Sequence, residues 1–406
     1  MSTGEASPRR PASTGQHRFE ALDVGGKRVV LLLQGGGALG AYQVGAFQAL
    51  SAICTKIDWV AGISIGALNA AVIAGNTPEE APRKLERLWH DLAQPPYDAW
   101  LLPFWPFLSR RGLSPLVPKY LDWALSAVPF GQPNFFTSRV LSPRNPWLLQ
   151  WFGPREPREL GFYSPEPLRE TLTDPRRAYV DWDRINRDGE GTRLSLGATN
   201  VDDGEFTFFN SFEPKTKLAG RQTLSVDHVL AAGALPPAFA PYRIEGTNGT
   251  PSRYYWDGGL VSNTPLLELG DELRSEDTIV FDIQLWDRKH YQPLHTLDEA
   301  IWRERSITFA SRKKQAEELV RKHQAEVDAG YLATRLEIVQ IMYEENPTEP
   351  AFWAGDADFS LKSYRERFER GKLDMESAFE ESHVAFAGSA ARLYRRGSYL
   401  KHLATD

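Results

Sequence analysis

The sequence has little of what marks secreted and membrane-spanning proteins. It contains a single cysteine, Cys54, so no disulfide can form within the chain, as is typical of a reducing compartment. Cys54 lies in an apolar helical stretch, where we expect it to pack in the core. No run reaches about 18 uninterrupted apolar residues, and residues 1–15 lack the apolar core of a secretory signal. We therefore expect a cytoplasmic protein, with peripheral membrane contact left open.

Excess positive charge is also missing. The chain has 47 Lys and Arg against 53 Asp and Glu, a net charge of -6, which argues against a nucleic-acid partner. With 42% hydrophobic residues, its 406 residues can form a globular core of two or three domains, or one large domain with an appendage.

The order of predicted strands and helices indicates a layered fold. A Ser-, Pro-, Gly- and Arg-rich stretch predicts a disordered tail over residues 1–22. Two short apolar runs, 28–33 and 57–63, then predict strands buried on both faces, and helical spacing follows each, over 38–53 and 67–74. This βαβα opening predicts an α/β fold with a mostly parallel sheet. Further elements are expected as strands at 193–199, 205–210 and 278–285 and a helix at 226–234.

Two later segments differ in character from this pattern. Residues 95–162 combine many Trp and Phe with many prolines and no clean period, which predicts an aromatic-rich insertion or cap. Its aromatic residues suit acyl-chain contact or membrane anchoring, or they pack the insertion onto the core or an oligomer interface. Residues 291–406 are charged and helical in pattern, which predicts a helical C-terminal extension to a main domain over 23–290. The helices of this extension are candidates for oligomerisation.

A serine lies between glycines directly after the second predicted strand, as Gly62-Ile-Ser64-Ile-Gly66. This G-x-S-x-G pattern between a strand and a helix is typical of a nucleophile elbow, whose strained turn requires small neighbours and exposes the serine hydroxyl. The following helix N-terminus can stabilise a developing anion there. Ser64 is therefore the candidate nucleophile; the alternative is a tight turn in which it caps the helix.

A glycine-rich loop, Gly35-Gly-Gly-Ala-Leu-Gly40, directly follows the first predicted strand. Residues with small or no side chains let backbone N–H groups converge on one volume, which can hold an oxyanion. Because parallel strands end at the same sheet edge, we expect this loop beside Ser64.

The same glycines, Gly35, Gly37 and Gly40, also match the G-x-G-x-x-G dinucleotide fingerprint. That fingerprint requires an acidic residue at the end of the second strand, whereas Asp58 stands near its start. Nucleotide binding, like a purely structural glycine turn, is thus a minor alternative.

A third motif, Asp257-Gly258-Gly259, would alone indicate only a turn. Beside a serine nucleophile it supplies a candidate base, which need not be histidine. Among the eight histidines, His228 is expected at the surface or as a helix cap. His290 follows Asp257 in the Ser, Asp, His order of α/β-hydrolases and stays open as an alternative.

Together, in this order, the three motifs resemble the patatin-like phospholipase family. Its pattern joins a glycine-rich oxyanion loop, a G-x-S-x-G elbow and a D-G-G or D-G-A motif. The resemblance covers about residues 27–285 and includes the small-residue and proline stretch at 231–239 and the Asn-Thr-Pro at 263–265.

The resemblance implies a three-layer α/β/α fold and a lipid acyl hydrolase of phospholipase A or lysophospholipase type, without metal or cofactor. Ser64 would attack the acyl carbonyl, Asp257 would take its proton, and the oxyanion would be held by backbone N–H groups of Gly36, Gly37 and Ala38. One departure is Ala38 itself, since many members carry Arg or Lys in this loop. A carboxylate is a weak base at neutral pH, so we expect Asp257 to be partly buried, with a perturbed pKa.

Two other functions remain open on the same motifs. One is a soluble short-chain esterase, thioesterase or polyester-depolymerising hydrolase that uses the same Ser64 and Asp257. The other is a non-catalytic lipid-binding or scaffold protein.

Overall fold

The computed structural model describes residues 26–93, 131–139, 156–187, 189, 191–246, 251–287, 294–310, 315–344, 355–382 and 391–397. The predicted N-terminal tail and most of the aromatic-rich insertion lie outside these residues, as does His290.

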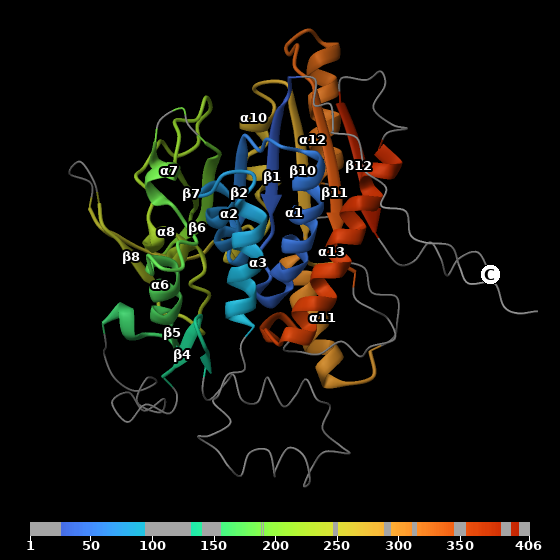
Figure 1. Ribbon diagram of the computed structural model, residues 1–406. Coiled ribbons are helices and arrows are strands. Elements are labelled where there is room, and N and C mark those ends of the chain that lie inside the picture. Colours follow the sequence, from blue (N-terminus) through green and yellow to red (C-terminus); the bar gives the residue numbers. More distant parts are fainter. Residues whose placement is uncertain are drawn as a thin grey trace, which may run out of the picture.

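A mixed sheet of nine strands in the described chain forms the middle layer (Figure 1). Its order is β12-β11-β10-β1-β2-β6-β9-β8, and β7 pairs with β6. The strands from β12 to β6 are parallel, whereas β7, β8 and β9 pair antiparallel. The strand bounds are β1 (Arg28–Leu33), β2 (Trp59–Ile63), β6 (Arg193–Asn200), β7 (Phe206–Asn210), β8 (Tyr242–Ile244), β9 (Arg253–Asp257), β10 (Thr278–Gln284), β11 (Leu336–Met342) and β12 (Ala391–Gly397).

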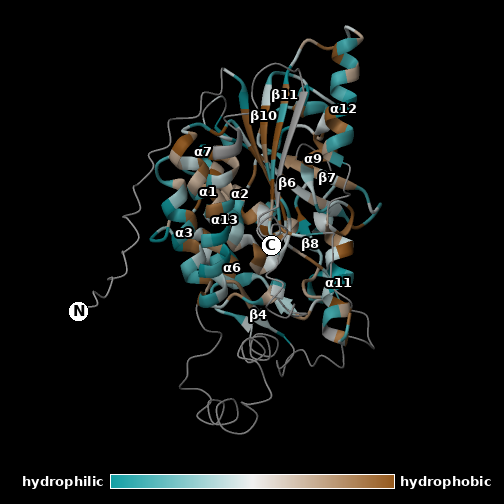
Figure 2. Ribbon diagram, turned by 90° about the vertical axis from the view of Figure 1, so that its right-hand side faces the viewer, coloured by the Kyte–Doolittle hydropathy of each residue, from teal (hydrophilic) through white to brown (hydrophobic). Residues whose placement is uncertain are grey.

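Helices cover both faces of this sheet, with α1, α2, α3 and α13 on one face and α9 and α12 on the other (Figure 2). Their bounds are α1 (Ala41–Ile53), α2 (Ile65–Ala74), α3 (Ala81–Leu92), α6 (Glu166–Thr173), α7 (Trp182–Asn186), α8 (Val226–Ala232), α9 (Pro265–Glu268), α10 (Gly270–Leu273), α11 (Leu297–Phe309), α12 (Gln315–Asp328) and α13 (Leu361–Ser382). Short 3-10 turns are η1 (Gly37–Gly40), η4 (Pro157–Glu159), η5 (Gly258–Leu260) and η6 (Gly355–Ala357). Over the described ranges, no helix is both long and apolar enough to cross a bilayer.

The burial of strand β1 on both faces accounts for the three layers. Leu31 and Leu33 pack into the core on the side of α1, whereas Val30 and Leu32 pack into the core on the side of α9. A continuous apolar run satisfies both cores at once, as expected for a parallel strand covered on two faces. The predicted three-layer α/β/α fold is confirmed.

A second, three-stranded sheet lies apart from the first. Two of its strands belong to the described part of the predicted insertion, and the third follows directly after it. The sheet pairs β3 (Gly131–Gln132), β4 (Phe136–Ser138) and β5 (Tyr163–Ser164) antiparallel. This sheet brings Phe136 and Tyr163 into edge-to-face contact, with 4.8 Å between their ring centroids.

The C-terminal segment differs from the expected helical extension. It contributes β11 and β12, which continue the central sheet beyond β10 in parallel register. Its α13 packs so closely on α1 that a Cβ at Gly45 or Gly371 would overlap backbone of the other helix. The expectation of a purely helical extension is therefore wrong, because 291–406 also builds part of the central layer.

The sequence pattern does not predict strand β11, because polar residues interrupt its apolar run. Glu337 and Gln340 are both buried. Glu337 accepts from Lys27 Nζ at 2.9 Å, and Gln340 Nε2 donates to Asp282 Oδ2 at 2.7 Å. Each polar group thus finds a partner outside its own strand, which no local pattern records.

Candidate active site

Ser64 occupies the turn between β2 and α2, in the strand–turn–helix arrangement that its motif predicts. Its φ of 55° is in the left-handed region, a strained conformation for a residue with a side chain. The flanking glycines make the turn possible, since a Cβ at Gly62 would overlap the backbone of Gly66. The backbone thus holds a half-buried serine hydroxyl at the carboxyl edge of the sheet.

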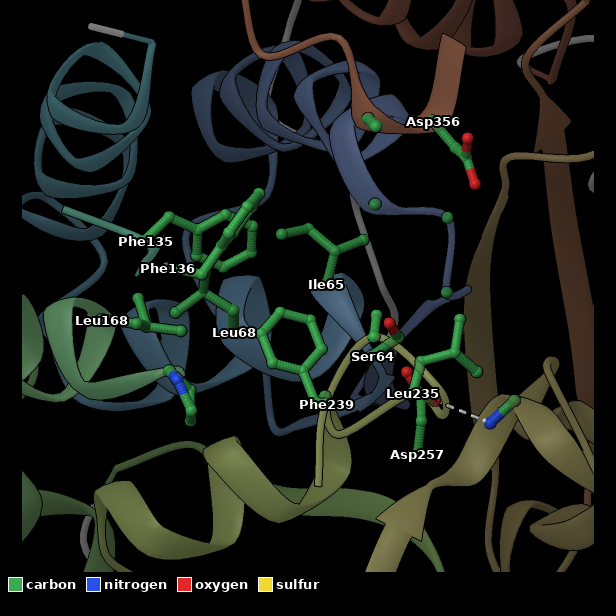
Figure 3. Close-up of a pocket in the computed structure, with 18 of the residues that line it drawn as sticks. Ser64, Ile65, Leu68, Phe135, Phe136, Leu168, Leu235, Phe239, Asp257 and Asp356 are labelled. Carbon is green, nitrogen blue, oxygen red and sulfur yellow. Dashed lines mark hydrogen bonds between the residues drawn. The ribbon is translucent and has the colours of Figure 1, made fainter. Parts of the chain in front are cut away.

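Asp257 ends β9 and faces Ser64 across this edge (Figure 3). Its carboxyl group lines the same cavity as the Ser64 side chain and accepts the Gly259 N–H at 2.8 Å. The residue is only 1% exposed. Burial raises the pKa of Asp257 to about 6, against the lowering effect of the neighbouring Ser64 side chain and Gly259 N–H. The carboxyl group is therefore a stronger base than an exposed aspartate, as the sequence analysis expects.

The predicted glycine loop lies beside this pair. Gly35, Gly36 and Gly37 line the same cavity as Ser64 and Asp257, whereas Ala38 is buried in η1 and does not line it. Gly37 has a φ of 55°, and a Cβ there would overlap the carbonyl oxygen of Asp356. The backbone N–H groups of Gly36 and Gly37 are therefore candidate oxyanion donors.

The glycine loop is held by side chains from other elements. Trp286 Nε1 and Asn263 Nδ2 both donate to the carbonyl oxygen of Gly35, at 2.8 and 3.0 Å. The Gln34 side chain accepts from the Leu285 N–H at 2.6 Å and donates to Thr264 Oγ1 at 2.9 Å. Sequence analysis misses Gln34 and Trp286 as positioning residues, although a glutamine directly after an apolar strand is a usable signal.

The other motif glycines serve close packing. A Cβ at Gly40 would lie 2.7 Å from the Ile65 side chain, and one at Gly258 would lie 2.8 Å from the Gly197 backbone. These contacts bring η1 and η5 close to their neighbours, and so fix the loops that carry the candidate site.

The cavity around Ser64 has a volume of about 320 Å³ and two chemically distinct sides (Figure 3). On one side of Ser64, the lining is apolar. It is formed by Ile65, Leu68, Phe135, Phe136, Leu168 and Phe239. On the other side are the glycine loop and Asp356. Such an arrangement can bind an apolar chain at one end and place polar atoms at the other.

The described histidines do not line this cavity. His228 is buried, and its Nδ1 accepts the Ser225 N–H at 3.1 Å as part of the α8 cap. The predicted capping role is thus confirmed, although the residue is not on the surface. Burial lowers the pKa of His228 to about 4. His290 lies outside the described residues, so the base that the described site offers is Asp257.

The position of Asp58 explains why the glycine loop does not meet the requirements of a dinucleotide-binding site. Its side chain accepts the Val29 N–H at 2.9 Å, at the amino end of β1. The glycine loop follows the carboxyl end of the same strand. An acidic residue at the opposite end of the strand cannot reach a ribose bound to that loop.

Several solved structures are similar to this chain at low sequence identity. The solved structure of VipD from Legionella pneumophila is similar at 15% identity and a TM-score of 0.35, covering 92% of this chain and 71% of that one. Human GIVD cytosolic phospholipase A2 is similar at 12% identity and a TM-score of 0.39, covering 88% and 59%. ExoU from Pseudomonas aeruginosa, solved with SpcU, is similar at 15% identity and a TM-score of 0.30, covering 88% and 52%. The chain thus spans less than two thirds of the last two proteins.

The comparison with curated proteins gave no significant match. The sequence model of one family, patatin-like phospholipase, matches residues 31–269, which is more than half of the chain. This range contains the glycine loop, the Ser64 elbow and the Asp257 turn. The chain therefore belongs to the patatin-like phospholipase family, a family of lipid ester hydrolases.

Proposed function

We propose that the protein hydrolyses carboxylic esters of lipids through a dyad of Ser64 and Asp257. The observation that carries this proposal is a serine in a strained turn beside a buried aspartate with a raised pKa, both lining one cavity with the glycine loop. A buried carboxylate without a cationic partner destabilises a fold, so its position against a serine favours a chemical role.

The reaction would proceed in two halves. Ser64 Oγ attacks the acyl carbonyl carbon while Asp257 accepts the serine proton, and the Gly36 and Gly37 N–H groups bind the resulting oxyanion. Collapse of this intermediate breaks the bond to the alcohol, which leaves with the proton from Asp257. Water then attacks the acyl-enzyme and gives its proton to Asp257. The second collapse releases the fatty acid and returns the proton to Ser64.

The apolar side of the cavity supports a substrate with an acyl chain of some length. Phe136 packs against both Phe135 and Phe239, with 5.4 and 5.9 Å between the ring centroids. Burial of each CH₂ against such a wall contributes about 0.8 kcal/mol, which favours long acyl chains over short ones. Thioester cleavage, membrane contact and oligomerisation stay predictions, as does a donor role for Ala38.

A fluorophosphonate probe tests the proposed nucleophile directly. We expect one covalent adduct, which peptide mapping by mass spectrometry places on Ser64, because the dyad activates this hydroxyl for attack on phosphorus. Heat-unfolded protein is the control and should not react, since activation depends on the folded site. An adduct on a different residue, or a protein that cleaves lipid esters without reacting at Ser64, would contradict the dyad.

The pH dependence follows from the raised pKa of Asp257. Only the ionised carboxylate can accept the serine proton, so kcat/KM for a neutral ester should fall as the pH decreases through about 6. Fatty acid release from a substrate with no ionisable group gives this profile. The inflection should be measured at two temperatures, because carboxyl ionisation has a near-zero enthalpy and imidazole ionisation does not. An inflection that shifts strongly with temperature would indicate a histidine base instead.

A further inference from the structure

The C-terminal segment contributes the charged end of the active-site cavity. Arg305 comes from α11 and Asp356 from η6, and both line the cavity. Among the lining residues that the structure describes, Arg305 alone carries a positive charge. Both residues lie beyond the range that matches the family, so this chain adds them to the site by its own C-terminal segment.

The two side chains form an ion pair next to the glycine loop. Arg305 Nη1 lies 2.6 Å from Asp356 Oδ1. The Asp356 backbone is in close contact with Gly37, which places the pair beside the candidate oxyanion donors. Both side chains stay partly accessible, at 32% and 21% of their surface, so the guanidinium is not sealed within the protein.

Asp356 lies on the opposite side of Ser64 from the aromatic wall (Figure 3). An ester whose acyl chain lies against Phe135 and Phe136 therefore directs its alcohol part toward the end of the cavity that holds Arg305. A guanidinium stays charged at any pH of interest, and its planar N–H donors match the oxygen atoms of a phosphate.

We propose that Arg305 is a specificity-determining residue, which selects esters whose alcohol part carries a phosphate group, and that Asp356 positions its guanidinium. This inference rests on the proposed ester hydrolysis at Ser64. The glycine loop of this chain has Ala38 and no cationic side chain. Arg305 thus brings a positive charge to this cavity from a distant part of the sequence.

A substitution of Arg305 alone would also change the environment of Asp356. Burial raises the pKa of Asp356, while Arg305 lowers it. Loss of Arg305 alone would leave an unpaired carboxylate beside the oxyanion donors, which would slow hydrolysis of every ester. The double variant Arg305→Gln with Asp356→Asn removes both charges together and avoids this effect.

The test compares monopalmitoylglycerol with its phosphate monoester, which differ only in the phosphate group. Both are presented in the same neutral detergent micelles, so that the charge of the lipid surface does not contribute. The kcat/KM ratio of the phosphate ester to the neutral ester should fall about tenfold in the double variant, as expected for loss of one charge-assisted hydrogen-bonding site. Arg305→Lys should recover part of that ratio, because it restores the charge without the planar donors.

The outcome distinguishes substrate selection by Arg305 from a purely structural role of the ion pair. A larger loss of kcat/KM on the phosphate ester than on the neutral ester supports selection by Arg305. An equal loss of kcat/KM on both substrates would mean that the ion pair only holds η6 to α11. An unchanged ratio would mean that the phosphate does not reach Arg305. Either result overturns the inference about Arg305 but leaves the proposed ester hydrolysis at Ser64 intact. A wild type that cleaves neither ester overturns the proposed function itself, and the inference with it.

Discussion

Ser64→Ala should lower kcat for lipid ester hydrolysis by about 10⁴-fold to 10⁶-fold, the range expected when the nucleophile of a coupled catalytic group is removed. The substitution deletes only the hydroxyl that lies beside Asp257 in the cavity. The oxyanion donors and the apolar wall stay in place, so substrate binding should change little. Fatty acid release under single-turnover conditions separates the two effects.

Ser51→Ala is the matched control for this loss. Ser51 lies on α1, does not line the cavity, and its hydroxyl donates only to the Gln48 carbonyl oxygen, at 2.9 Å. This variant should keep wild-type kcat and show a similar thermal unfolding midpoint. If Ser64→Ala kept more than a tenth of the wild-type rate, a different nucleophile would have to act.

Asp257→Asn should lower kcat by about 10³-fold to 10⁴-fold, because an amide cannot accept the serine proton. Asparagine has nearly the same shape and can still accept the Gly259 N–H, so the turn should keep its geometry. The rate should be measured at the pH optimum of the wild type, where Asp257 is fully ionised.

His290→Gln distinguishes a dyad from a triad, because it removes the histidine that follows Asp257 in chain order. A dyad predicts that this variant keeps most of its activity. A loss as deep as that of Asp257→Asn would show that the aspartate acts through a histidine.

Asp257→Asn should also stabilise the protein at mildly alkaline pH, in contrast to its effect on rate. The pKa of Asp257 is about 6 in the folded protein, above the ordinary value of 3.8. Between these values the folded state binds more protons, so the free energy of unfolding contributed by this group falls as the pH rises. Asparagine removes that dependence. Thermal unfolding midpoints of variant and wild type should therefore separate above about pH 6 and converge below pH 4.

The sequence by itself determined the parts of the site that depend on local conformation. The apolar run of β1 and the glycine-flanked Ser64 can be read from a few neighbouring residues, because strand burial and a strained turn restrict which side chains fit. The predicted strand at 28–33 coincides with β1, and the strand and helix around Ser64 differ from prediction by only two residues at one end of each. The motif order was enough to identify the family, which the sequence comparison confirms.

Only the tertiary structure decided what depends on contacts between distant segments. Glu337 and Gln340 lie in a buried strand because Lys27 and Asp282 meet their polar groups, so the helical interpretation of the C-terminal segment failed. The raised pKa of Asp257 likewise results from burial by surrounding elements. Arg305 and Asp356 line the site only because 291–406 continues the central sheet and returns to the glycine loop. Pairing and desolvation of polar groups are properties of the folded chain, and they set the chemistry at Ser64.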